Sequence, residues 1–294
     1  MFLLTYSYNN KESVGFLNEE KTGIIPAWIV FQGAEDLDML GIIEKFDTIE
    51  LKEIKDIIDT YKETIKLNEV KVLSPIPYPK RNVICLGKNY LDHVKEVKSL
   101  KNVNSDIPQK PIYFSKIASP AIGHEDVVNS HSHLVRQLDY EVELALIIGR
   151  KCKNVSDEEA ENCIFGYTIA NDISARDIQT SHGQWHKGKS FDTFCPLGPY
   201  LVHKSNISFP PKLKIQSYVN NELRQKGNTG DLIFDIPAII SDLTTGITLY
   251  PGDIILTGTP AGVGAGFNPP KYLKPGDKVD CLIEGIGTLS NTIA

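Results

Sequence analysis

Three acidic residues are the strongest sign of chemistry in this sequence, because each lies in an otherwise apolar, β-prone stretch. In LDYEVELALIIGR (residues 138–150), side-chain alternation along a strand places Glu141 and Glu143 on one face, roughly 6.5 to 7 Å apart at Cα. Asp172 lies in the next such stretch, IFGYTIANDISARD (residues 164–177). Buried carboxylates are costly to ionise without a compensating cation. Oxygen donors with no His or Cys nearby favour Mg²⁺, Mn²⁺ or Ca²⁺ as that cation.

Spacing alone leaves a second interpretation of these carboxylates open. Glu141 and Glu143 would also fit a solvated strand face on which they pair with Lys or Arg across the sheet, and E-x-E is a common pattern. The continuation LALIIG favours the buried interpretation, because it is apolar on both faces and predicts a covered strand.

Two further segments carry residues suited to proton transfer and charge stabilisation. Lys189, in KGKSF, could neutralise negative charge on an enolate or alkoxide, although an isolated lysine would by default face solvent. His93 and Glu96, in GKNYLDHVKEV, stand at i and i+3, so one helical turn brings them together and makes His93 a candidate general base. A His near a Glu on a charged helix is also common on protein surfaces. The polar segment LKNVNSDIPQK that follows is typical of a mobile lid.

Candidate anion-binding residues follow the second acidic stretch. Arg176 and Gln179 come four and seven residues after Asp172, so a helix beginning at Asp172 would place all three on one face. There they could bind a substrate carboxylate, Arg176 through two parallel hydrogen bonds, or Arg176 could simply pair with Asp172. Thr259 lies in LTGTPAGVGAG, where a tight loop after a strand could turn its hydroxyl and backbone N–H groups toward an anion. The loop lacks the Gly-Lys-Ser/Thr of a P-loop, so no nucleotide site is inferred.

Composition argues against several classes of function. The 294 residues, 41% hydrophobic and 23% charged, suffice for one large or two modest domains. A net charge of −6 with no dense Lys/Arg block removes the electrostatic basis for binding nucleic acid or an anionic membrane. No stretch approaches the roughly 18 apolar residues of a membrane span, and the start does not resemble a secretion signal. Five scattered cysteines argue against a disulfide framework or a structural zinc site, so we expect a cytoplasmic protein.

The chain divides into two expected domains. Residues 1–74 suggest a small α/β unit, with a hairpin formed by MFLLTYSY and SVGFLN and amphipathic helices over LDMLGIIEKF and LKEIKDIIDTYKETIK. Pro75, Pro77 and Pro79 fix extended backbone and mark the boundary. Beyond it, short apolar strands separated by Gly, Pro and Asp predict a mainly β domain over residues 75–294.

Several of these segments, taken together and in order, resemble the fumarylacetoacetate hydrolase family. The resemblance extends over about residues 75 to 294, and many segments in one order are more specific than any single motif. The segments that carry it are GKNYLDHVKEV, PIYFSKIASP, LDYEVELALIIG, FGYTIANDISARDIQ, GKSFDTFCPLGP, DIPAIISDLTTGITLYPGDIILTGTPAGVG and LKPGDKVDCLIEGIGTLSN. It implies a mainly β (α+β) protein, with a mixed β-sandwich roll as the catalytic domain, a small N-terminal α/β domain, and usually a homodimer.

The resemblance also implies a role for each candidate residue. The implied metal ligands are Glu141, Glu143 and Asp172. The implied catalytic residues are the acid–base pair His93 and Glu96 and the active-site lysine, Lys189. The positions that line the family's substrate pocket are Arg176, Gln179 and Thr259. The fourth acidic ligand that fumarylacetoacetases place in their N-terminal half has no clear counterpart, which makes a true fumarylacetoacetase a less favoured interpretation.

The implied activity is that of an enzyme, dependent on Mg²⁺ or Mn²⁺, that acts on a small-molecule 2-oxo acid. The leading hypothesis is an oxaloacetate decarboxylase or tautomerase, or an acylpyruvate C–C hydrolase, working through an enolate stabilised at the metal. An alternative is a 2-hydroxyhepta-2,4-diene-1,7-dioate isomerase of aromatic catabolism, which needs no water. Outside catalysis, the cation could simply stabilise the fold of a binding protein.

Overall fold

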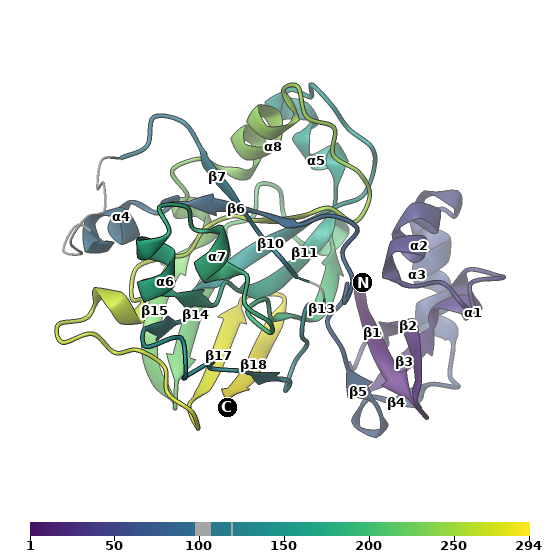
Figure 1. Cartoon of the computed structure of the whole chain (residues 1–294). Helices are drawn as coiled ribbons and strands as arrows, with labels where there is room; N and C mark the ends of the chain where they lie inside the picture. Colours follow the sequence, from purple (N-terminus) through teal and green to yellow (C-terminus); the bar gives the residue numbers. More distant parts are fainter. Residues whose placement is uncertain (98–106, 119) are drawn as a thin grey trace.

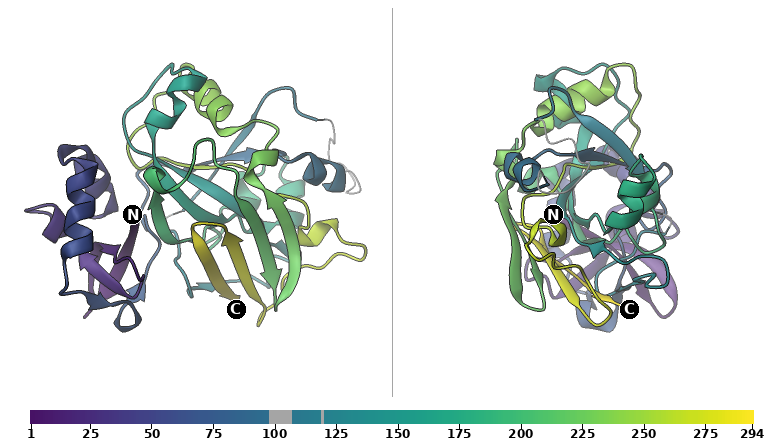
Figure 2. Two further views of the ribbon diagram at one scale, coloured as in Figure 1. Left: turned by 180° about the vertical axis from the view of Figure 1, so that it is seen from behind. Right: turned by 60° about the vertical axis from the view of Figure 1, so that its left-hand side comes forward.

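The computed structural model describes residues 1–97, 107–118 and 120–294. It has a small N-terminal unit, purple in Figure 1, which lies beside a larger β-rich body that contains the rest of the chain. Figure 2 shows the same division from behind. Most of the predicted lid, residues 100–110, lies outside the described residues. None of the helices formed by the described residues has the length and apolar character needed to cross a bilayer.

A mixed sheet of 11 strands runs through both parts of the molecule. Its order is β4-β3-β2-β1-β13-β11-β10-β16-β6-β7, with β5 paired to β1. The strands are β1 (Phe2–Tyr8), β2 (Lys11–Leu17), β3 (Gly23–Pro26), β4 (Ile65–Lys66), β5 (Lys71–Val72), β6 (Val83–Gly87), β7 (Ile112–Lys116), β10 (Val142–Ile148), β11 (Ile164–Asn171), β13 (Leu197–His203) and β16 (Ile254–Leu256). Because β1 pairs with β13, one continuous hydrogen-bonded ladder joins the N-terminal unit to the larger body. The domain boundary before residue 75 stays a prediction.

A second sheet of five strands faces the first in the larger body, with the order β15-β14-β17-β18-β8. Its strands are β8 (Val127–Val128), β14 (Lys214–Val219), β15 (Glu222–Asn228), β17 (Lys278–Ile283) and β18 (Gly287–Ile293). A separate short pair joins β9 (Leu138–Asp139) to β12 (Ser174–Ala175) in antiparallel register. The second sheet and the pair both matter for the site, because they fix the loops around it.

The helices are short and lie around the sheets. The α-helices are α1 (Ala27–Val30), α2 (Met39–Lys45), α3 (Leu51–Thr60), α4 (Leu91–Val97), α5 (Ala160–Cys163), α6 (Arg176–Ser181), α7 (His186–Lys189) and α8 (Ile236–Thr244). The 3₁₀ helices are η1 (Phe46–Thr48), η2 (Leu67–Glu69), η3 (Asp157–Glu159), η4 (Lys204–Asn206), η5 (Thr229–Asp231) and η6 (Gly264–Gly266). In Figure 1, α4, α6 and α7 lie on the same side of the larger body.

The N-terminal unit confirms part of its predicted pattern and corrects part. Strands β1 and β2 form the predicted hairpin, and both turn residues, Asn9 and Asn10, have positive φ, as a tight two-residue hairpin requires. Helices α2 and α3 form where the amphipathic pattern predicts them. The second predicted helix was expected to extend to residue 66, which is wrong, because α3 ends at Thr60. Ile65 instead pairs with Ile24 in the β3–β4 ladder, which overrides the helical periodicity.

Strand β10 is buried along its whole length, which confirms the prediction of a covered strand. On one face, Leu144 and Leu146 belong to a core shared with the five-stranded sheet. On the other face, Ala145 and Ile147 belong to a core shared with the N-terminal unit. Glu141 and Glu143 share this second face, at the opposite end of the strand. The sheet therefore presents carboxylates in the same deeply packed layer that holds the two parts of the chain together.

Truncating a β10 side chain should destabilise the whole fold. We expect Leu146→Ala to lower the free energy of unfolding by about 2–5 kcal/mol, because Leu146 is fully buried and leaves a cavity between two packed sheets. Urea unfolding followed by tryptophan fluorescence measures the change. The control, Leu223→Ala, removes a side chain that is 44% exposed and should change that free energy by no more than about 0.5 kcal/mol. Equal effects of the two substitutions would contradict this account of the core.

Candidate active site

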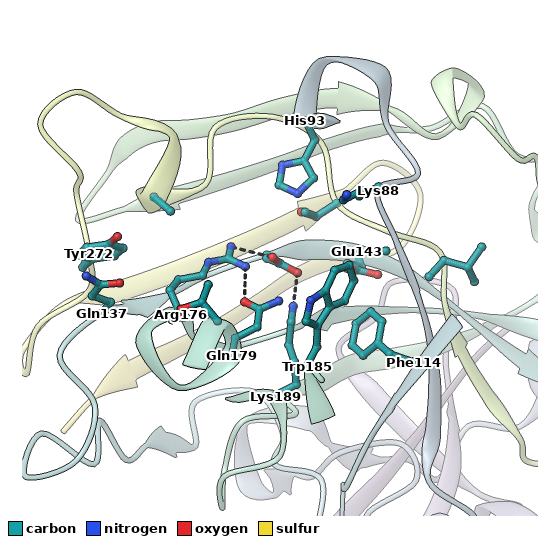
Figure 3. A pocket seen from close by; sticks show the side chains of 16 residues that line it. Lys88, His93, Phe114, Gln137, Glu143, Arg176, Gln179, Trp185, Lys189 and Tyr272 are labelled. Atoms are coloured by element: carbon teal, nitrogen blue, oxygen red, sulfur yellow. Dashed lines mark hydrogen bonds and ion pairs between the residues drawn. The ribbon is translucent and has the colours of Figure 1, made fainter. Parts of the chain in front are cut away.

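A cavity of about 340 Å³ opens beside the acidic end of β10. This volume is at the lower end of the range for ligand pockets, about 300–1,000 Å³, and suits a small substrate. The predicted site residues that line it are His93, Glu141, Glu143, Arg176, Gln179, Lys189 and Thr259. His93 and Lys88 reach into the cavity from one side, and Lys189, Trp185 and Phe114 from the opposite side (Figure 3).

The three predicted metal ligands meet at the wall of this cavity, which Glu141 and Glu143 line. Glu141 lies just before β10 and Asp172 just after β11, and the antiparallel register of the two strands brings these ends together. The Asp172 N–H donates to the Glu141 carbonyl at 2.8 Å, which closes the ladder. One carboxylate oxygen from each of Glu141, Glu143 and Asp172 lies within 4.8 Å of the other two, and all three side chains are buried. The sequence therefore predicted a real cluster.

Two of these carboxylates are already neutralised by cations. Lys189 Nζ donates to Glu141 Oε2 and to Asp172 Oδ2, at 2.6 Å each. Arg176 Nη2 lies 2.7 Å from Glu141 Oε1, and Lys116 Nζ pairs with Asp172 Oδ1. By contrast, no Lys, Arg or His among the described residues pairs with Glu143, whose Oε2 accepts the Gly258 N–H at 2.6 Å. Glu143 is therefore the member of the cluster that forms no ion pair with any described residue, although the charge of Lys189 acts on it from nearby.

The surroundings of the two glutamates shift their pKa values in opposite directions. Burial alone would raise the pKa of Glu141, but the charges of Lys189 and Arg176 outweigh it and hold that pKa well below its ordinary value. Burial raises the pKa of Glu143 well above its ordinary value, and the negative charges of Asp172 and Glu141 raise it further. A cation beside Glu143 would reverse that shift. The donor set, which is three carboxylates without His or Cys, fits a divalent cation such as Mg²⁺ or Mn²⁺.

The charges around the cluster almost balance. The buried carboxylates are Asp139, Glu141, Glu143 and Asp172. The cations paired with them are Lys116, Arg176 and Lys189. With all groups ionised, four negative and three positive charges leave one excess negative charge. A divalent cation would convert that excess into one net positive charge, which suits an anionic substrate.

The predicted acid–base pair is in contact above the cluster. His93 Nδ1 lies 3.2 Å from Glu96 Oε2 on α4, as their i, i+3 spacing predicts. Glu96 Oε1 accepts the Gly262 N–H at 2.9 Å, so the carboxylate is held from two sides. His93 is only 7% exposed and points into the cavity (Figure 3), which excludes the interpretation of this pair as surface residues.

Arg176 and Gln179 lie together on the cavity wall, but the helix that carries them differs from the prediction. Helix α6 begins at Arg176 and not at Asp172, because residues 174 and 175 pair with β9 instead. The alternative ion pair between Arg176 and Asp172 is also wrong, since Arg176 binds Asp139 and Glu141. Arg176 Nη1 donates to Gln179 Oε1 at 3.1 Å. Its Nη2 is buried beside Glu141 Oε1 at 2.7 Å without an aligned hydrogen bond, so a substrate carboxylate would compete with Glu141 for that nitrogen.

Thr259 lines the cavity, but its hydroxyl already has partners. Its Oγ1 donates to the Val142 carbonyl at 2.9 Å and accepts from Gln225 Nε2 at 2.7 Å. A hydroxyl has one proton to donate, so Thr259 could donate to an anion only by giving up its bond to Val142. In this structure the residue fixes the loop after β16 against β10.

Three charged residues near the site were not singled out from the sequence. Lys116 is fully buried at the end of β7, where it also donates to the Phe194 carbonyl at 2.5 Å. Lys88 lines the cavity in a left-handed conformation, with φ 57°. Asp139 is fully buried and pairs with Arg176. The sequence offered a signal for two of them. Lys116 closes the apolar strand IYFSK and Asp139 precedes the E-x-E pattern, and both lie within segments that resemble the family.

Similarity to known proteins identifies the family and the fold of this chain. Residues 82–294 match the family described as fumarylacetoacetate (FAA) hydrolase C-terminal. The chain belongs to the fumarylacetoacetate hydrolase family. A solved fumarylacetoacetate hydrolase from Exiguobacterium antarcticum has a TM-score of 0.84 at 37% identity, covering 100% of this chain and 99% of that one. The predicted family and the mainly β, mixed β-sandwich roll fold are thus confirmed.

Two further relatives of this chain carry names that state a reaction. Oxaloacetate tautomerase YisK of Bacillus subtilis (strain 168) is 54% identical over 227 residues, which cover 77% of this chain and 74% of the relative. Maleylpyruvate hydrolase from Sphingobium sp. SYK-6, solved in complex with manganese(II) ion and pyruvate, has a TM-score of 0.78 at 28% identity. That alignment covers 100% of this chain and 99% of the other. Members of the family that act on small oxo acids therefore resemble this chain over most or all of its length.

Neutralising Glu143 should stabilise the metal-free protein and abolish its response to metal. A raised carboxyl pKa means that the folded state holds the proton more tightly than the unfolded state, so stability falls as pH rises above the ordinary carboxyl range. At about pH 8 in EDTA, Glu143→Gln should raise the melting temperature by about 2–4 °C, the shift that accompanies roughly 1 kcal/mol in a chain of this size. Thermal unfolding with and without Mg²⁺ measures both effects.

The matched control is Glu12→Gln, which neutralises an exposed glutamate of β2. It should leave both the EDTA melting temperature and the Mg²⁺-induced increase unchanged. A lower EDTA melting temperature for Glu143→Gln, or a Mg²⁺ response equal to that of the wild type, would contradict the account of the cluster.

Proposed function

We propose that this chain is a divalent-metal-dependent enzyme that interconverts the enol and keto forms of oxaloacetate. The observation that carries the proposal is the placement of the His93–Glu96 pair beside a buried carboxylate cluster in which Glu143 forms no ion pair within the described part of the chain. The 54% identity to a protein named oxaloacetate tautomerase supports the choice of substrate. The small volume of the cavity fits a compact 2-oxo acid better than a polymer.

The residues that would hold the metal are Glu141, Glu143 and Asp172. When bound, Mg²⁺ or Mn²⁺ would supply a Lewis acid that stabilises negative charge developing on the oxygen at C2 of a 2-oxo acid. Lys189 is the second source of positive charge at that oxygen. Burial tends to lower the pKa of Lys189, but Asp172 and Glu141 raise it above its ordinary value, so its ammonium stays protonated and acts as a fixed charge.

His93 and Glu96, on α4, carry out the proton transfer. In ketonisation, protonated His93 donates a proton to C3 while the C2 hydroxyl loses its proton to solvent, and enolisation reverses both transfers. Glu96 stabilises the imidazolium form of His93. Arg176 lines the cavity with Gln179 beside it, and it would bind a substrate carboxylate by giving up part of its contact with Glu141, which would orient the molecule. Tautomerisation needs no ordered water, which distinguishes it from the hydrolytic alternative.

Acylpyruvate-type C–C hydrolysis is the second candidate, supported by the similarity to maleylpyruvate hydrolase. In that reaction His93 would activate water instead of exchanging a proton with C3. Oxaloacetate decarboxylation would use the same cation without a base at C3, and isomerisation of 2-hydroxyhepta-2,4-diene-1,7-dioate would use His93 without water. The homodimer, the cytoplasmic location and the role of the cation as a mere fold stabiliser also stay as predictions to be tested.

Enol-oxaloacetate should lose its ultraviolet absorbance faster in the presence of the enzyme and Mg²⁺ or Mn²⁺, and EDTA should abolish the acceleration. His93→Ala should lower kcat by about 10²–10⁴-fold, the usual contribution of a general acid–base residue. The control His133→Ala removes an exposed histidine and should leave kcat unchanged.

A parallel panel distinguishes the alternatives. Pyruvate release from oxaloacetate reports decarboxylation, and loss of acetylpyruvate or of the dienedioate reports hydrolysis or isomerisation. Faster turnover of any of these than of the enol would contradict the proposed substrate. Mg²⁺-induced thermal stabilisation without turnover of any panel member would favour the binding protein.

A further inference from the structure

Asp139 has an unusually complete set of partners for a residue outside the predicted site. It is fully buried. Its Oδ2 accepts from Arg176 Nε at 2.9 Å and from the Ala265 N–H at 3.0 Å. Its Oδ1 accepts from the Gly264 N–H at 2.6 Å and from the Tyr140 N–H at 2.9 Å. One carboxylate thus ties the wall that carries Arg176 to the loop that contains η6.

That loop, residues 262–266, is the surface against which the acid–base pair is held, and we call it the glycine platform. The Gly262 N–H donates to Glu96 Oε1 at 2.9 Å, and Tyr140 Oη donates to the Gly262 carbonyl at 2.9 Å. A Cβ at Gly266 would lie 2.1 Å from Glu96 Oε1, which shows how closely the platform approaches that carboxylate. The platform therefore fixes Glu96, and through it the orientation of His93.

Asp139 also determines how Arg176 presents its guanidinium. The guanidinium is planar and rigid, so binding Nε fixes the directions of both terminal nitrogens. With Nε on Asp139, Nη1 donates to Gln179 and Nη2 lies 2.7 Å from Glu141 at the cavity wall. Without Asp139, the Nε–H of Arg176 would lose its partner, and the guanidinium could turn away from Gln179.

We propose that Asp139 is a positioning residue that holds two parts of the site in one geometry: Arg176, which binds a substrate carboxylate, and the glycine platform, which orients the His93–Glu96 pair. This inference rests on the proposed function, because it assigns Arg176 to the substrate. Asp139 acts through these groups and does not touch the substrate. Its loss should therefore weaken substrate binding through Arg176 and slow proton transfer through the platform, and the two effects are separable.

The test is a double-mutant cycle of Asp139→Asn and Arg176→Met. KM and kcat are measured with enol-oxaloacetate. Kd is measured with 3,3-dimethyloxaloacetate, which keeps both carboxylates and the 2-oxo group but has no proton at C3. Binding is followed by fluorescence of Trp185, which lines the cavity, in a Trp28→Phe background. Asp139→Asn should raise Kd and KM about tenfold in the presence of Arg176 and less than about twofold in the Arg176→Met background. It should lower kcat in both backgrounds, because the platform acts independently of Arg176.

Unchanged KM and kcat in Asp139→Asn would overturn the inference, and so would a rise in KM that persists undiminished without Arg176. If Asp139→Asn alone does not fold, the double variant removes both charges of the pair and creates no new unpaired buried ion, because Glu141 keeps Lys189. A kcat of the double variant equal to that of Arg176→Met would then overturn the inference, and a lower kcat would support it. If the wild type neither turns over nor binds these 2-oxo acids, the proposed function fails. A protected Nε–H signal of Arg176 in NMR spectra, lost in Asp139→Asn, still tests the Asp139–Arg176 contact by itself.

Discussion

Four carboxylates buried at one end of a β-sheet, with three cations to balance them, form the constraint on which this site depends. Ionising several acids in a packed interior is unfavourable unless each finds a counter-charge or a hydrogen-bond donor. Glu141, Asp172 and Asp139 find theirs in lysine and arginine side chains. Among the described residues Glu143 pairs with no cation and accepts the Gly258 N–H. Burial and the charges of Asp172 and Glu141 raise its pKa, so a divalent cation would be most stabilising beside it.

The fold makes this arrangement possible by packing both faces of β10. The five-stranded sheet covers one face and the N-terminal unit covers part of the other, where Phe46 packs edge-on against Phe165 with ring centroids 4.8 Å apart. That packing buries the layer in which the carboxylates lie, and the lower dielectric of a buried layer strengthens the charge interactions there. The N-terminal unit is thus connected to the chemistry through the sheet, although it contributes no side chain to the cavity.

The sequence predicted the parts of the site that depend on local periodicity. Alternation placed Glu141 and Glu143 on one face, and helical spacing joined His93 to Glu96, because both patterns depend only on neighbours along the chain. Ion pairs between residues far apart in the chain could not be predicted from such local patterns. Lys116 and Asp172 are 56 residues apart, and their pairing follows from sheet order, which no local pattern specifies. The start of α6 was mispredicted for a similar reason, since the β9–β12 pair is a tertiary contact.

The central claim is that Glu141, Glu143 and Asp172 together hold one divalent cation, and anomalous diffraction from crystals grown with Mn²⁺ tests it most directly. The account predicts a single strong manganese peak within bonding distance of one oxygen from each of the three carboxylates, and its disappearance in Glu143→Gln. A map with no manganese at these oxygens, or with the cation held elsewhere while Lys189 alone bridges Glu141 and Asp172, would contradict it.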